Sequence, residues 1–282
     1  SSVLIPETAA LALNGTNAVG LHPAMTGMQQ LYNEGKVTIV QGVSYPNPNY
    51  SHFRATDIIT SSSDADQVLT SGWCGRYLEQ EYPNFPTNYP NTDYPDPPAI
   101  QIGVGLPLLF QGTAANLAVT LSGTQIFDDW VNGSNGALPN TPAGHELGYL
   151  RTVAQQTQSY AGQITAAALN ITTQSPNYPA AGANPLADQL KLVARLIAGG
   201  LQTRIYLVSL GGFDTHASQV AATDTTTGTH ANLLSNLSQA IKAFMDDLAF
   251  LSIQDRVVGL TFSEFGRRII SNGSGGTDHG SA

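Results

Sequence analysis

The chain has 282 residues and a hydrophobic content of 41%, enough for one large α/β domain with a sizeable core. Lys, Arg, Asp and Glu together make up only 11% of it, against about a quarter in a typical soluble protein. A net charge of −9 and a pI near 4.9 argue against a basic surface for nucleic acid. The single cysteine, Cys74, excludes an internal disulfide framework and a cysteine-based zinc cluster.

No apolar run in the sequence approaches the roughly 18 residues of a membrane-spanning helix, so we expect no membrane span. A charge-poor surface rich in amides and hydroxyls is common in exported proteins, and we therefore expect a periplasmic or extracellular location. A start at Ser1 without an initiator Met fits a processed or truncated chain. The sequence does not indicate an oligomeric state.

The first third of the chain predicts two helices, over residues 22–32 and 66–83, from apolar residues at helical spacing. Between them, residues 37–40 read as a buried strand. The strand leads into a segment rich in Pro and Asn, which we expect to be a loop at the strand's carboxyl end.

Residues 84–98 are rich in Pro, Asn and Tyr and predict a surface excursion. The short apolar runs at 99–102 and 117–121 suit strands, which we expect to pair as an antiparallel appendage. We therefore predict that residues 84–140 form an insertion within a single α/β domain.

The second half predicts helices over 144–170, 185–197 and 229–251, and strands over 204–210 and 256–263. A strand, a helix and a strand with continuous apolar strands imply a right-handed βαβ unit. The expected fold is α/β, with a mostly parallel sheet and helices on both faces. Ligands in such sheets bind beyond the carboxyl ends of the strands.

Polar side chains follow each of the three long predicted strands, so we expect them to meet at one edge of the sheet. Carboxylates and neutral imidazoles together suit Zn, Mn or Fe, and a hydroxyl beside such an ion can become a nucleophile. The residues are Ser51, His52 and Arg54 after the first strand, Asp214 and His216 after the second, and Glu264, Arg268, Asp278 and His279 after the third.

Each of these residues also has an ordinary structural interpretation. Asp214 could cap the segment that follows it, and Glu264 could pair with Arg267 or Arg268. Ser51 could be an ordinary loop serine. The hypothesis of a site therefore depends on the combination and not on any single motif.

Several segments together resemble a bacterial family called domain of unknown function 1501, which is grouped with alkaline phosphatases, sulfatases and cofactor-independent phosphoglycerate mutases. The segments that carry the resemblance span nearly the whole chain. They are Gly20-Leu21-His22-Pro23-Ala24-Met25, residues 40–54, Gly72-Trp73-Cys74-Gly75-Arg76-Tyr77-Leu78, residues 190–197, Leu210-Gly211-Gly212-Phe213-Asp214-Thr215-His216, residues 261–268 and Gly276-Thr277-Asp278-His279-Gly280.

The resemblance implies an alkaline-phosphatase-like fold with one or two divalent ions (Zn, Mn, Mg or Ca) at the carboxyl ends of the strands. It implies that Ser51 is the nucleophile, that His52 belongs to the catalytic set, and that Arg54 or Arg268 binds the anionic oxygens. Asp214, His216 and His279 would hold one metal, and Glu264 would help to hold the second. Asp278 would be a ligand or would orient His279.

Two features of the wider superfamily have no counterpart in this sequence. The first strand of its members ends in an Asp ligand, here expected in a Gly-Gly-Asn-Asp-Gly type of turn, and a further strand normally follows the segment at Gly280. We therefore expect a fragment that lacks the first and last strands. Phe265 stands where phosphatases often place a histidine.

The leading functional hypothesis is a metal-dependent hydrolase of small phosphate or sulfate esters that uses Ser51 as nucleophile. The alternative is a catalytically silent exported binding or surface protein with the same fold, which would use residues 84–98 for recognition. A Ser/His/Asp esterase is a weaker third hypothesis, because the sequence has no Gly-x-Ser-x-Gly elbow around Ser51.

Overall fold

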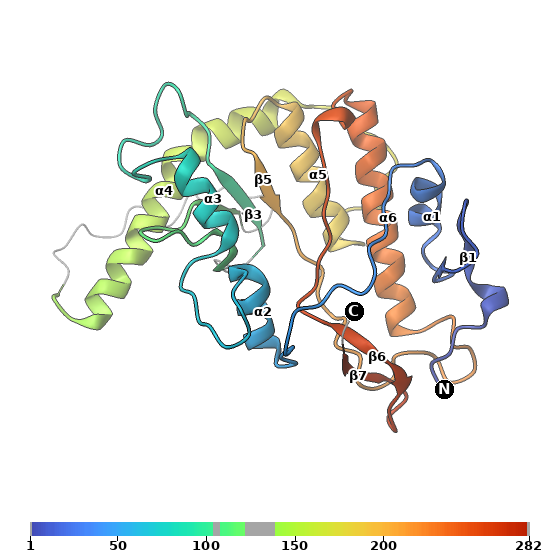
Figure 1. Ribbon diagram of the computed structural model, residues 1–282. Coiled ribbons are helices and arrows are strands. Elements are labelled where there is room, and N and C mark those ends of the chain that lie inside the picture. The colour runs from blue at the N-terminus through green and yellow to red at the C-terminus, as the bar shows by residue number, and fades with distance from the viewer. Residues whose placement is uncertain (1, 104–107, 122–138, 281–282) are drawn as a thin grey trace.

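The computed structural model describes residues 2–103, 108–121 and 139–280 (Figure 1). Its main helices form one row, α4, α5, α6 and α1, in which each contacts the next. The helices are α1 Thr26–Asn33, α2 His52–Ser61, α3 Trp73–Glu81, α4 Pro142–Asn170, α5 Pro185–Ala198 and α6 Thr229–Phe250. The strands are β1 Leu11–Ala12, β2 Gly20–Leu21, β3 Ala99–Ile102, β4 Ala118–Leu121, β5 Ile205–Leu207, β6 Gly266–Ser271 and β7 Thr277–Gly280.

The core is a small parallel sheet with the strand order β4-β3-β5. All four residues of the central strand β3 are buried, so both faces of the sheet are covered at this strand. The buried cluster around it takes side chains from α3 and from α4, α5 and α6. The chain is therefore an α/β protein, as the sequence predicts.

The expected antiparallel pairing of the runs at 99–102 and 117–121 is wrong. β3 and β4 are parallel, with Ala99 opposite Ala118, and β3 also pairs with β5. The predicted insertion over 84–140 thus supplies two strands of the main sheet. The part of it at 104–107 and 122–138 lies outside the described residues, and the insertion itself stays a prediction.

Two of the three long predicted strands do not form. Residues 37–40 and 257–263 are in no strand, and the strand predicted over 204–210 is reduced to β5, Ile205–Leu207. Val258 is 97% exposed and Leu260 is 77% exposed. A strand requires a paired neighbour as well as an apolar sequence, and neither segment has one among the described strands. The βαβ unit predicted over 204–263 is therefore also wrong.

The predicted helices agree better with the structure than the predicted strands. Asn184 begins α5, as predicted, by accepting a hydrogen bond from the Ala187 amide, and Pro185 occupies the first turn. Helix α2, His52–Ser61, was not predicted and begins just after the segment expected to be a loop. None of the helices in the described ranges combines the length and the apolar character of a membrane span.

Aromatic rings in and beside segment 84–98 pack against one another. The rings of Tyr82, Phe85, Tyr89 and Tyr94 contact one another, and Tyr82 and Phe85 are buried. Tyr82 and Phe85 belong to the main hydrophobic core, and Tyr89 packs against it.

Two glycines allow α3 to pack against the segment before β4. A Cβ atom on Gly72 would lie 2.0 Å from the Leu108 carbonyl oxygen, and one on Gly75 would lie 2.2 Å from that of Gln111. Cys74 between them is buried, and its burial raises the thiol pKa to about 11. The Gly-Trp-Cys-Gly segment is thus a close-packing motif with an unreactive thiol.

A buried carboxylate of α6 binds the segment that follows α4, and this segment also bonds to α5. Asp247 of α6 is fully buried and accepts hydrogen bonds from the Ser175 amide and from Gln174 Nε2, both at 2.8 Å. Gln174 in turn bonds to the Lys191 carbonyl oxygen and to Arg195 Nε on α5. This network fixes the connection between α4 and α5.

We predict that Asp247→Ala lowers the free energy of unfolding by about 3 kcal/mol, because it leaves the Ser175 amide and the Gln174 side chain without their acceptor. Urea denaturation followed by circular dichroism measures the change. Asp255→Ala, at an exposed position, is the matched control. A variant at position 247 as stable as the control would contradict this role.

His22 and His230 bring the segment before α1 against the first turn of α6. Their ring centroids lie 6.5 Å apart, and His230 also contacts the Phe213 ring at 6.0 Å. Nδ1 of His230 is buried and has no hydrogen-bond partner among the described residues. Burial, and then the proximity of His22 and Arg267, lowers the pKa of His230 below its ordinary value of 6.5.

A histidine whose pKa is lowered by folding stabilises the protein above its unfolded pKa and loses that contribution as the pH falls. We therefore predict that the free energy of unfolding decreases more steeply below pH 6.5 in the parent protein than in His230→Gln. Denaturation midpoints measured between neutral and mildly acidic pH give the two slopes. Equal slopes would contradict the assignment.

Candidate metal centre

Four separate segments bring the predicted site residues together. The start of α2 carries His52, the segment after β5 carries Asp214 and His216, and the segment before β6 carries Glu264. Strand β7 carries Asp278 and His279 and pairs antiparallel with β6. The convergence expected from the sequence thus occurs, although two of the three strands thought to cause it are not formed.

The carboxylate of Asp214 lies at the centre of this cluster. Its Oδ1 atom is 2.9 Å from Nε2 of His216 and 2.9 Å from Nε2 of His279. Its Oδ2 atom is 3.2 Å from Nε2 of His52. The same ring nitrogen of three histidines therefore points at one carboxylate.

The other ring nitrogen of each histidine faces an oxygen that can accept a hydrogen bond from it. Nδ1 of His52 is 2.8 Å from Glu264 Oε1, and Nδ1 of His216 is 3.2 Å from Asp278 Oδ1. Nδ1 of His279 is 2.7 Å from the Tyr50 carbonyl oxygen, which can only accept. We assign the proton of each neutral ring to Nδ1, which leaves a lone pair on Nε2.

The carboxylates of the cluster are ionised. Burial by itself would raise the pKa of Asp214, but contacts with His279, Arg267 and His52 lower it far below its ordinary value. For Glu264, burial is also outweighed, and its own backbone and then His52 lower the pKa. Asn272 and then His216 lower the pKa of Asp278. All three groups are therefore acceptors at neutral pH.

The donor atoms fit a divalent transition metal. One ligand atom from each of His52, Asp214 and His279 lies within 4.8 Å of the others. Nε2 of His52 is buried and makes no aligned hydrogen bond with a described residue, and Nε2 of His216 lies 2.8 Å from that of His279. Nitrogen lone pairs that face one another and a carboxylate repel unless a proton or a cation lies between them. Imidazole donors favour Zn, Mn or Fe over Mg and Ca.

The structure places Glu264 and Asp278 each against a histidine Nδ1. From there both would orient an imidazole of a bound metal from outside the ligand set. Asp278 contacts His216, whereas the sequence-based expectation paired it with His279. His52, expected in the catalytic set, lies among the candidate ligands.

Arg267, Asn272 and Gly276 support the cluster and were not assigned to it from the sequence. Arg267 donates to Asp214 Oδ1 at 3.0 Å and to the Phe213 carbonyl oxygen, while Asn272 Nδ2 donates to Asp278 Oδ1 at 3.0 Å. A Cβ atom on Gly276 would lie 2.4 Å from the Thr215 carbonyl oxygen, so only glycine lets β7 come this close. The adjacent residues Arg267 and Arg268 could have indicated this role. Neighbouring residues of a strand face opposite ways, so one of the two arginines would face the cluster.

Ser51 lies beside the cluster at the N-cap of α2, where its side chain makes no capping hydrogen bond. The residues before and after it, Tyr50 and His52, both bond to residues of the cluster. The Arg54 guanidinium points away from the cluster and donates to the carbonyl oxygens of Asp64, Ala65 and Gln67. Arg268 is exposed, with Nη1 4.0 Å from Asp278 Oδ2.

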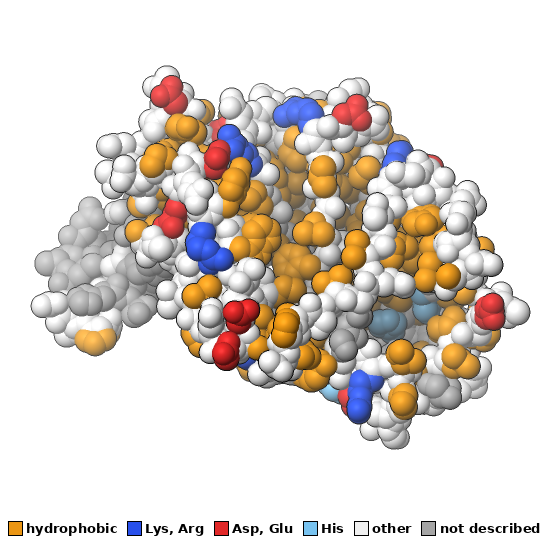
Figure 2. All heavy atoms as spheres, viewed as in Figure 1, with side chains coloured by type: hydrophobic (Ala, Val, Ile, Leu, Met, Phe, Trp, Pro, Cys, Tyr) orange, Lys and Arg blue, Asp and Glu red, His pale blue; other side chains and the backbone are white. Residues whose placement is uncertain are grey.

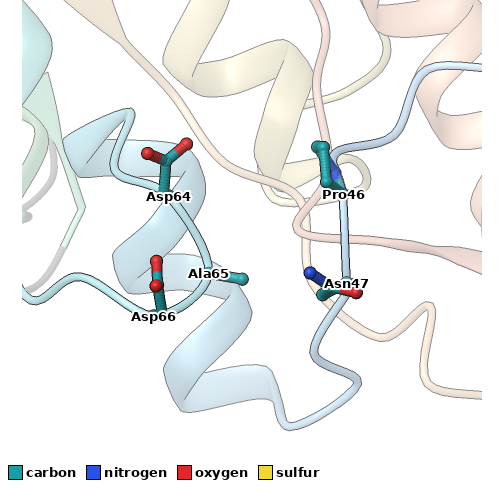
Figure 3. A pocket seen from close by; sticks show the side chains of 5 residues that line it. All are labelled: Pro46, Asn47, Asp64, Ala65 and Asp66. Atoms are coloured by element: carbon teal, nitrogen blue, oxygen red, sulfur yellow. The ribbon is translucent and has the colours of Figure 1, made fainter.

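Two cavities lie near these elements. One, of about 580 Å³, is bounded by Tyr50, His279 and the exposed part of β6 and opens beside the cluster. The other, of about 400 Å³, lies between the loop at Pro46 and Asn47 and the loop after α2 (Figure 3). The second is lined by Asp64 and Asp66 but by no histidine, so its lining does not match the donor set of the cluster.

We predict that the protein binds zinc and that His216→Ala weakens the affinity by at least about a hundredfold. Glu264→Ala, which removes only the partner of His52, should weaken it by about ten- to a hundredfold. Competition with a chromogenic chelator measures both affinities. His230→Ala, outside the cluster, should bind zinc like the parent protein, and equal affinities in all four proteins would contradict the site.

The comparisons with known proteins returned one finding. The model of the family described as "Protein of unknown function (DUF1501)" matches residues 147–282, which include Asp214, His216, Glu264, Asp278 and His279. Searches of curated proteins and of solved structures each gave no significant match. The carboxyl-terminal part of the chain is therefore similar to the DUF1501 family.

Proposed function

We propose that this protein is a metal-dependent hydrolase of small phosphate or sulfate esters, related in fold to alkaline phosphatases and sulfatases and acting outside the cytoplasm. The observation that carries the proposal is the arrangement of three Nε2 atoms around the Asp214 carboxylate, each imidazole held from behind by an oxygen acceptor. A bound divalent ion would supply positive charge to the oxygens of the ester and to the attacking hydroxyl.

Ser51 is the proposed nucleophile because of its position on the chain. It precedes the first turn of α2, a helix of ten residues, whose amino-terminal end favours negative charge. Since its hydroxyl does not cap the helix, it is available to form the bond to phosphorus or sulfur. The serine proton would pass to solvent, the bond from that atom to the alcohol oxygen would break, and the alcohol would leave with a proton from solvent. Water would then displace the Ser51 oxygen, which regains a proton, and would release phosphate or sulfate.

The anionic oxygens of the ester require a cation that the fold leaves accessible. Arg267 is already bonded to Asp214 and Thr277, and Arg54 is bonded to three carbonyl groups. The side chain of Arg268 is 65% exposed and borders the cavity beside the cluster. We therefore assign the anion-binding role to Arg268.

We predict that the zinc- or manganese-loaded protein hydrolyses p-nitrophenyl phosphate or p-nitrophenyl sulfate, and that Ser51→Ala lowers kcat/KM by at least about a hundredfold. Release of p-nitrophenolate measures turnover. Ser51→Ala should bind the metal as the parent does, because its hydroxyl is not among the ligands.

Ser44→Ala, an exposed serine in the same loop, is the matched control and should retain full activity. Undiminished turnover in Ser51→Ala would contradict its role as nucleophile. Tight metal binding without turnover of either ester would favour the alternative of a catalytically silent binding protein.

A further inference from the structure

The hairpin of β6 and β7 is irregular where it borders the metal-binding cluster. Arg267 pairs with His279 and Ser271 pairs with Thr277, so Arg268, Ile269 and Ile270 stand opposite the single residue Asp278. Such a bulge bends the strand and turns its side chains out of the regular alternation. Bulges are frequent beside active sites, where they redirect a side chain toward a ligand.

Two of the three bulged residues are much more exposed than their chemistry favours. Ile269 is 95% exposed and Ile270 is 78% exposed, although both are large aliphatic side chains. Over this hairpin, at the lower edge of the molecule, Figure 2 shows a basic side chain beside hydrophobic ones. Adjacent exposed apolar residues with a neighbouring cation are typical of a binding surface.

This surface forms one wall of the cavity of about 580 Å³ next to the cluster. Tyr50 lies on another side, and His279 and Gly280 complete the lining. His279 faces Asp214 through Nε2, so the cavity lies next to the candidate metal centre. It is an open depression of the surface.

We infer that the bulge Arg268–Ile270 is the substrate-recognition wall and that it selects esters with an apolar aryl or alkyl alcohol. Arg268 would bind the anionic head beside the cluster, while Ile269, Ile270 and Tyr50 contact the apolar group. A sugar or another polyhydroxylated alcohol would leave its hydroxyls without partners against these two isoleucines. The inference rests on the proposed function and names the substrate class of the same site.

Binding of non-hydrolysable phosphonates tests the wall separately from turnover. Isothermal titration of the zinc-loaded protein with phenylphosphonate and methylphosphonate compares two ligands that share an anionic head and differ in apolar area. We expect phenylphosphonate to bind about tenfold more tightly. The double variant Ile269→Asn, Ile270→Asn should bind both ligands equally, and Arg268→Gln should weaken both.

The matched control is Leu169→Asn, at a 72% exposed position on α4, which should keep the tenfold preference. If the parent binds the two phosphonates with equal affinity and still hydrolyses esters, the recognition role of the bulge is contradicted, while the proposed hydrolase function is not. If the preference for phenylphosphonate depends on both isoleucines but no ester is hydrolysed, the recognition role is supported and the hydrolase function is contradicted.

Analytical ultracentrifugation of the parent and of the double variant tests whether a second copy of the chain binds this surface instead. A parent dimer that becomes a monomer when both isoleucines are replaced would show that the bulge binds a second copy of the chain, and would overturn the inference. A sedimentation coefficient unchanged by the replacement, together with the loss of the phenyl preference, would support it.

Discussion

The site depends on the Asp214 carboxylate, because side chains from segments far apart in the sequence all contact it. Two imidazole nitrogens and the Arg267 guanidinium face Oδ1, and a third imidazole faces Oδ2. Without positive charge between them, the neutral imidazoles would present lone pairs to an anion. The arrangement is therefore stable only with protons or a cation at its centre, and the acceptors behind the rings favour the cation.

The fold holds this arrangement through a few close backbone contacts. Gly276 lets β7 lie against Thr215, and the Tyr50 carbonyl oxygen joins the start of α2 to His279. The ring of Phe265 contacts the rings of both His52 and His279 and covers one side of the cluster. Phe265 is thus a packing residue beside the cluster.

The sequence predicted the class of the fold and the membership of the site better than it predicted the strands. Helices such as α5 were predictable because a cap, a proline and an apolar stripe lie within one local segment. Segments 37–40 and 257–263 have strand composition but no paired neighbour, and pairing is not a local property. Exposed Val258 and Leu260 show the result: an apolar strand sequence whose side chains remain at the surface.

Position after predicted strands and the family resemblance singled out Asp214, His216 and His279, and the structure brings these residues together. Their individual roles were not predictable in this way. Whether Glu264 or Asp278 binds a metal or orients a histidine depends on which ring nitrogen it faces, which only the three-dimensional arrangement shows.

X-ray absorption spectroscopy of the zinc-loaded protein tests the central claim most directly, because it reports the atoms around the ion whether or not any ester is turned over. We predict a first shell of nitrogen and oxygen with the outer-shell scattering of three imidazoles, from His52, His216 and His279. A shell of oxygen atoms without imidazole scattering would contradict the assignment of Asp214 and the three histidines as the metal site.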